Sequence, residues 1–105
     1  MQSEPSLFST LSGDPHLGEL VELYVQEMPE RIALLERLAA AQQWEELARA
    51  AHQLKGSAGG YGFGILAGPA ERLEQAARKG ADTTSILQAL AQLVQLCRRI
   101  GPATH

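Results

Sequence analysis

Two side chains suited to nucleophilic and electrostatic chemistry, His52 and Lys55, stand three residues apart in the segment AAHQLKGSAGGYGFG, residues 50–64. Residues three apart on a helix lie on the same side of it. An imidazole in water is largely neutral at pH 7, so one ring nitrogen keeps a lone pair and is a competent nucleophile. The Lys55 ammonium, one helical turn along, would neutralise an anionic group such as a phosphoryl group arriving at that nitrogen.

The apolar residues of this region predict that His52 points to solvent. They recur every three or four positions and would line the buried face of a helix: Trp44, Leu47, Ala51, Leu54, Ala58 and Tyr61. At about 100° per residue, His52 lies roughly 130° away from the mean direction of that face. Arg49 and Gly56 point almost opposite the buried face, while Lys55 and Gly59 flank His52.

Glycines at solvent-facing helix positions indicate close approach by another molecule. Gly56 and Gly59 each cost about 0.5–1 kcal/mol relative to alanine in a helix interior, and packing gives no reason to keep them. We therefore expect them to admit the backbone of a partner next to His52. Gln53, on the other flank of the ring, is a further candidate contact, and Arg49 is a candidate for steering an acidic partner surface.

Helical periodicity dominates the chain, and no alternating segment flanked by turn residues indicates a strand. The pattern predicts an all-α fold. Four helices of about 15 to 20 residues, joined by short turns, would form an antiparallel, up-down four-helix bundle with a short N-terminal extension or helix. We place the bundle domain at residues 14–101, after an N-terminal extension over 1–13 and before a C-terminal tail over 102–105.

Capping residues and prolines predict where the helices begin. Asp14, with proline after it, is expected to cap the first helix, whose apolar stripe includes Leu20. Pro29 should restart or bend the chain, and Pro69 should kink or delay the fourth helix. Asp82, or one of the hydroxyl residues after it, can cap the last helix.

Composition narrows the class of protein. With 105 residues, 45% of them hydrophobic and 20% charged, the chain is expected to be one globular domain. It has no apolar run long enough to span a bilayer and no basic region at its start, so a cytoplasmic location without a membrane partner is expected. The net charge of −3 and the lack of a Lys/Arg cluster argue against nucleic acid. Cys97 falls in an apolar stripe and is expected to be buried.

Three segments of the chain resemble one known family. These are HQLKGSAGGYGF from His52 to Phe63, LEQAAR from Leu73 to Arg78, and the upstream pair Tyr24 and Pro29. Over about residues 14–100 the chain is similar to the histidine-containing phosphotransfer (HPt) domain of bacterial multistep phosphorelays, part of two-component signal transduction. The four-helix bundle of that family agrees with the periodicity.

The resemblance implies a role for each matched residue. His52 would accept a phosphoryl group from the aspartyl phosphate of one receiver domain and pass it to the aspartate of another. Lys55 matches the family lysine near the phosphohistidine, and Gly56 matches the glycine that gives the receiver access. The chain would be a phosphocarrier without its own ATP site or cofactor, and Mg²⁺ would be held by the receiver. Expected partners are response-regulator receiver domains and a hybrid sensor histidine kinase, bound by a monomer.

The same residues bear on other kinds of site and of helical domain. The glycine-rich run lacks the P-loop pattern, because Lys55 precedes the glycines and no strand leads into them. No metal site is expected, because His16, His52 and His105 are scattered without nearby ligands. A helical interaction module without phosphotransfer and the phosphoacceptor domain of a chemotaxis-type kinase both remain open.

Overall fold

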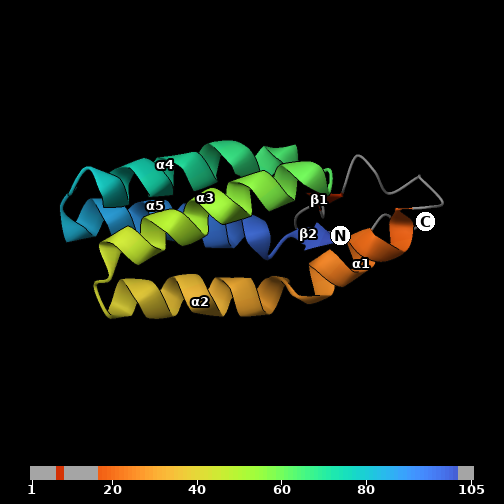
Figure 1. Cartoon of the computed structure of the whole chain (residues 1–105), viewed down its shortest axis with the longest axis horizontal. Coiled ribbons are helices and arrows are strands. Elements are labelled where there is room, and N and C mark those ends of the chain that lie inside the picture. Colours follow the sequence, from red (N-terminus) through yellow and green to blue (C-terminus); the bar gives the residue numbers. More distant parts are fainter. Residues whose placement is uncertain (1–6, 9–16, 102–105) are drawn as a thin grey trace, which may run out of the picture.

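The computed structural model describes residues 7–8 and 17–101, and this part of the chain confirms the all-α prediction. The described residues form five α-helices, which Figure 1 labels in chain order. Their bounds are α1 Gly18–Gln26, α2 Met28–Ala40, α3 Trp44–Gly60, α4 Ala67–Arg78 and α5 Thr83–Cys97. A single 3₁₀ turn, η1 (Gly64–Leu66), leads into α4, and two short strands, β1 (Leu7–Phe8) and β2 (Ile100–Gly101), pair in parallel.

Helices α2 to α5 form the predicted four-helix bundle, and α1 extends beyond one end of it (Figure 1). Helices α3 and α5, with 17 and 15 residues, have the expected length, whereas α2 and α4, with 13 and 12, are shorter than expected. Each packs on its neighbours in chain order, and α2 also packs on α5. The groove between α3 and α4 therefore lies on the opposite side of the bundle from the groove between α2 and α5.

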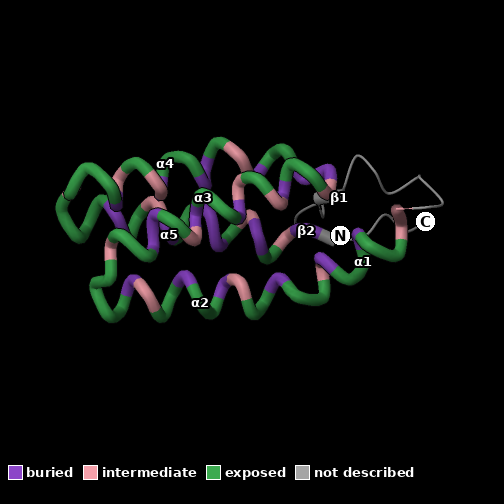
Figure 2. The backbone as a smooth tube through the Cα atoms, viewed as in Figure 1, coloured by how far each residue is buried: buried purple, intermediate pink, exposed green. Residues whose placement is uncertain are grey.

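The core is built from the apolar stripes that the sequence predicts. Figure 2 shows the buried positions recurring along the inner side of each bundle helix. The largest fully buried side chains are Phe63, Leu35, Leu47, Leu66, Leu73, Ile86, Leu93, Val21 and Cys97. Burying each of the leucines contributes about 1.5–3 kcal/mol. Burial also raises the pKa of the Cys97 thiol to about 11, as expected for a thiol packed among apolar side chains.

Two details of the helix predictions need correction. Leu20 was expected on the buried face of the first helix, but it is 45% exposed, because α1 lies past the end of the bundle and buries only Val21 and Tyr24. Pro69 neither delays nor interrupts α4, which runs from Ala67 to Arg78, since it is the third residue of the helix, where backbone N–H groups have no intrahelical acceptor. Asp82 occupies the N-cap of α5 and accepts a 2.6 Å hydrogen bond from the Ser85 hydroxyl. Asp14 lies outside the described residues.

An aromatic contact joins α1 to the end of α3. The rings of Tyr24 and Tyr61 stack with centroids 4.6 Å apart, and the hydroxyls of Tyr24 and Ser57 share a 2.8 Å hydrogen bond. The guanidinium of Arg31 lies 4.1 Å from the Tyr24 ring centroid. Immediately after Tyr61 the chain turns through Gly62, whose φ of 85° favours glycine. These contacts fix the C-terminal end of the helix that carries His52.

Candidate functional site

His52 is the midpoint of the 17-residue helix α3, and its side chain is 59% exposed, so the prediction that it points to solvent is confirmed. The neighbouring Ala51 and Leu54 are buried and hold the helix against the bundle. The imidazole is therefore presented by a rigid helix while the ring itself stays accessible.

One ring nitrogen of His52 is held by a residue from the next helix. Nδ1 lies 3.2 Å from both Oε1 and Oε2 of Glu74 on α4. An ionised carboxylate can only accept hydrogen bonds, so this contact places the Nδ1 proton between the two side chains. No described residue forms a hydrogen bond with Nε2 of His52, and that nitrogen is left for a reacting group.

Glu74 is the centre of a small ionic cluster in the groove between α3 and α4. Its side chain is only 12% exposed, and it accepts a 3.1 Å hydrogen bond from Nε of Arg78. Nζ of Lys55 lies 3.7 Å from its other oxygen. Burial alone would raise the pKa of Glu74, but the hydrogen bonds from His52 and Arg78 and the charges of His52 and Lys55 together lower it. Glu74 is therefore ionised at neutral pH.

Lys55 lies over α4 with its side chain 30% exposed. Besides Glu74, its ammonium faces Glu71 at 3.9 Å. Both distances exceed that of a hydrogen bond, so the ammonium is attracted to these carboxylates without being fixed by them. The sequence prediction placed Lys55 near His52 but did not include the two carboxylates that attract it.

The glycines near His52 face open space. Gly56 and Gly59 are exposed, and a Cβ added at either would meet no atom within 4 Å. Neither glycine is therefore required by packing within the chain. This is the surface that the sequence argument expects, with the backbone of α3 uncovered for one to two turns after His52.

Arg49 and Gln53 lie on the same exposed side of α3. The side chain of Arg49 is 62% exposed and pairs with Glu46 at 3.6 Å. Gln53 borders a hollow of about 240 Å³ between α2 and α3. The hollow is lined by Arg31, Leu34, Leu35, Ala50, Gln53, Leu54 and Ser57. His52 thus stands between a charged flank toward α4 and a more apolar flank toward α2.

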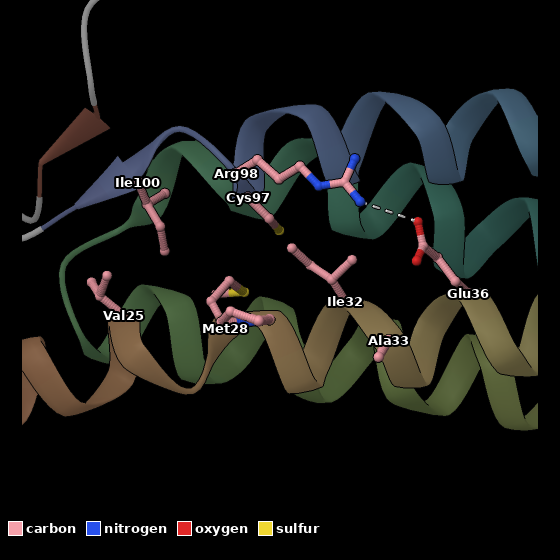
Figure 3. Close-up of a pocket in the computed structure, with 9 residues that line it drawn as sticks. Val25, Met28, Ile32, Ala33, Glu36, Cys97, Arg98 and Ile100 are labelled. Carbon is pink, nitrogen blue, oxygen red and sulfur yellow. Dashed lines mark ion pairs between the residues drawn. The ribbon is translucent and has the colours of Figure 1, made fainter.

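A larger hollow, of about 360 Å³, lies away from this site (Figure 3). It opens between α2 and α5, where Met28, Ile32 and Cys97 turn toward it. Arg98 and Glu36 form an ion pair of 3.6 Å at its border. None of the residues predicted for the candidate site lines this hollow, and it belongs to the opposite groove of the bundle.

Comparison with known protein families identifies the family of this chain. Residues 19–100, which are most of the chain, match the family described as Hpt domain. The chain belongs to the Hpt domain family. This membership implies histidine phosphotransfer in phosphorelay signalling by a phosphocarrier domain that interacts with receiver domains and kinases. No curated protein and no solved structure gave a significant match.

In the described part of this HPt domain, no helix is long and apolar enough to cross a membrane. The structure brings His52, Lys55, Gly56 and Gly59 together on one side of α3, with Arg49 and Gln53 beside them.

Glu74 is the site residue that sequence reasoning missed. It stands 22 positions from His52, within the LEQAAR segment, and no role was assigned to it. The available indication was the spacing of Glu71, Glu74 and Arg78, which puts two carboxylates and a guanidinium on one face of α4. Without the packing of α3 on α4, that face could equally be a solvated surface.

Proposed function

We propose that His52 is the phosphoacceptor of this HPt domain. It takes a phosphoryl group from the aspartyl phosphate of one receiver domain and passes it to the aspartate of another. The observation that carries this proposal is an imidazole with 59% of its side chain exposed, in the middle of a well-packed helix, whose Nε2 forms no hydrogen bond with any described residue. The fold does not need this ring, since Ala51 and Leu54 hold the helix in place.

The residues present suit phosphoryl transfer. The Nε2 lone pair forms the bond to phosphorus while the bond between phosphorus and the receiver's aspartate oxygen breaks, and the aspartate leaves as a carboxylate. The transition state is largely dissociative, so it needs positioning and charge neutralisation more than covalent help. Lys55 supplies positive charge from this chain. Mg²⁺ and the second reacting group belong to the receiver, and the HPt domain acts as a carrier without an ATP site or cofactor of its own.

The surface around His52 supports binding of receiver domains, including the receiver of a hybrid sensor histidine kinase. Gly56 and Gly59 leave the backbone of α3 open to close approach. Gln53 and the hollow beside it offer a polar contact next to apolar side chains. Arg49 is exposed on the same helix and can steer an acidic surface. A single accessible histidine needs no symmetry mate, so we propose that the domain works as a monomer.

The test is transfer of radiolabelled phosphate from phosphorylated receiver domains to the wild-type chain and to His52→Gln. We expect acid-labile, base-stable label on the wild type and none on His52→Gln. The matched control is His105→Gln, which removes another histidine and should leave labelling unchanged. If no receiver labels the wild type while binding to receivers persists, the chain is an adaptor that does not transfer phosphate.

A further inference from the structure

The hollow between α2 and α5 combines an apolar lining with a charged border (Figure 3). Small-molecule sites span about 300–1,000 Å³, and this hollow, at about 360 Å³, is near the lower end of that range. Six of its lining side chains are aliphatic or contain sulfur: Val25, Met28, Ile32, Ala33, Cys97 and Ile100. Such a lining favours a ligand that is mostly hydrocarbon.

The floor of the hollow carries no charge. Met28, Ile32 and Cys97 turn toward it, and each is buried, with 2 to 6% of its surface exposed. Burial raises the pKa of the Cys97 thiol to about 11, so the thiol is uncharged at neutral pH. Ala33 borders the hollow with a short, exposed side chain, which leaves room for a ligand beside it. An aliphatic chain placed here would exchange water for hydrocarbon and sulfur, which favours binding in proportion to the area buried.

Arg98 supplies a cation at the border of the hollow. Its side chain is 63% exposed, and its guanidinium reaches toward Glu36 of α2 at 3.6 Å (Figure 3). This distance exceeds that of a hydrogen bond, so the N–H donors of the guanidinium are not used up by Glu36. Both partners are about half exposed, and ion pairs in such surroundings are weak. A carboxylate that formed two parallel hydrogen bonds with Arg98 would therefore replace Glu36 as its partner.

We propose that this hollow binds an aliphatic monocarboxylate of medium chain length, with its hydrocarbon chain over Met28 and Ile32 and its carboxylate on Arg98. A ligand amine could pair with Glu36 instead, but an ammonium is more strongly hydrated than a guanidinium and lacks its paired donors, so the acid is favoured. None of the residues proposed for receiver binding lines the hollow. The site is thus separate from the face that carries His52, and it does not depend on the proposed phosphotransfer.

The probe is octanoate, compared with hexanoate and decanoate for chain length and with octanol and octylamine for the head group. Isothermal titration calorimetry on the full chain measures affinity, and amide shifts in ¹H–¹⁵N NMR spectra locate the ligand. The variants are Arg98→Gln, which removes the cation, Glu36→Gln, which removes its competitor, and Ala33→Phe, which adds a ring at the border. Arg37→Gln is the matched control, because Arg37 is an exposed arginine on α2 that does not line the hollow.

We expect saturable, one-to-one binding of octanoate, with amide shifts confined to the residues around the hollow. Affinity should rise about fourfold for each added methylene until the hollow is filled. Arg98→Gln should weaken octanoate binding about tenfold or more and leave octanol binding unchanged, as for the loss of a charge-assisted hydrogen bond. Glu36→Gln should tighten octanoate binding about threefold. Ala33→Phe should weaken the binding of both ligands, and Arg37→Gln should keep the wild-type affinity within about twofold.

Equal affinity of Arg98→Gln and the wild type for octanoate would overturn the proposal, as would octanol or octylamine binding as tightly as octanoate. Binding that does not saturate, with shifts spread over the whole surface, would show an adventitious additive only and would overturn it as well. His52→Gln should bind octanoate as the wild type does. A failure of this site therefore leaves the proposed phosphotransfer untouched, and a failure of phosphotransfer leaves this site untouched.

Discussion

Replacing Gly56 should change stability and phosphotransfer in opposite directions. Gly56 lies within α3 at a negative φ, and a Cβ there would meet no atom within 4 Å. Alanine therefore removes the entropic penalty of glycine without a clash, and the free energy of unfolding should rise by about 0.5–1 kcal/mol. For a domain of this size, that corresponds to an increase in Tm of about 2–8 °C.

The same change places a side chain on the surface where we expect the receiver's backbone. Glutamine has a helix propensity close to that of alanine but a much longer side chain. Gly56→Gln should therefore keep most of the gain in stability while slowing transfer from a phosphorylated receiver by tenfold or more. Thermal unfolding by circular dichroism measures the first effect, and rapid-quench transfer kinetics measures the second.

The matched control is Gly60→Ala. Gly60 is also helical and also faces open space, but it lies a further turn along α3 from His52. The Gly60→Ala variant should be more stable than the wild type. Its transfer rate should stay within about twofold of the wild-type rate, since a surface change away from the contact has little effect. If Gly56→Gln transfers as fast as the wild type, Gly56 does not serve access to His52. If Gly56→Ala is less stable than the wild type, the space around this position is not open.

Two further predictions concern Lys55 and Cys97. Lys55→Ala should slow transfer to His52 by about tenfold with little loss of stability, and Lys55→Arg should recover part of the rate. Single-turnover assays measure these rates. Equal rates for the wild type and both variants would exclude a role for the Lys55 charge. Burial raises the pKa of Cys97 from 9.0 to about 11, so the folded state retains the thiol proton after the unfolded chain has lost it. The resulting stability is present below pH 9 and is lost as pH rises toward 11, by up to about 2–3 kcal/mol. Urea unfolding at pH 8 and pH 10.5 should show this loss in the wild type, and Cys97→Ala should show a smaller one; the same loss in both chains would assign it to other groups.

The direction of His52 could be predicted from the sequence because it depends on one helix only. The apolar stripe from Leu47 to Ala58 defines the buried side of α3, and the angle per residue then places the histidine opposite to it. The exposed glycines follow from the same calculation. No information about neighbouring helices is needed for either conclusion.

The partner of His52 could not be predicted in this way. Glu74 comes from α4, and its position depends on the register of α3 against α4, which periodicity does not determine. Leu20 shows the same limitation, since its apolar character suggested burial but α1 extends beyond the bundle and leaves it exposed. Local spacing thus predicted the buried face of the bundle helices, whereas contacts between helices required the packed structure.

The pairing of β1 with β2 brings residues 7–8 next to residues 100–101, at the end of the bundle where α1 lies (Figure 1). This is also the end where α3 finishes, because Tyr24 of α1 stacks on Tyr61. His52 is eight residues before Gly60, about 12 Å along the helix from that end. A tether leaving the chain at β1 or at β2 would thus start from the same place and span nearly the same distance to the imidazole. The effective concentration of a tethered receiver would then depend on tether length and stiffness, and hardly on which of the two strands carries it.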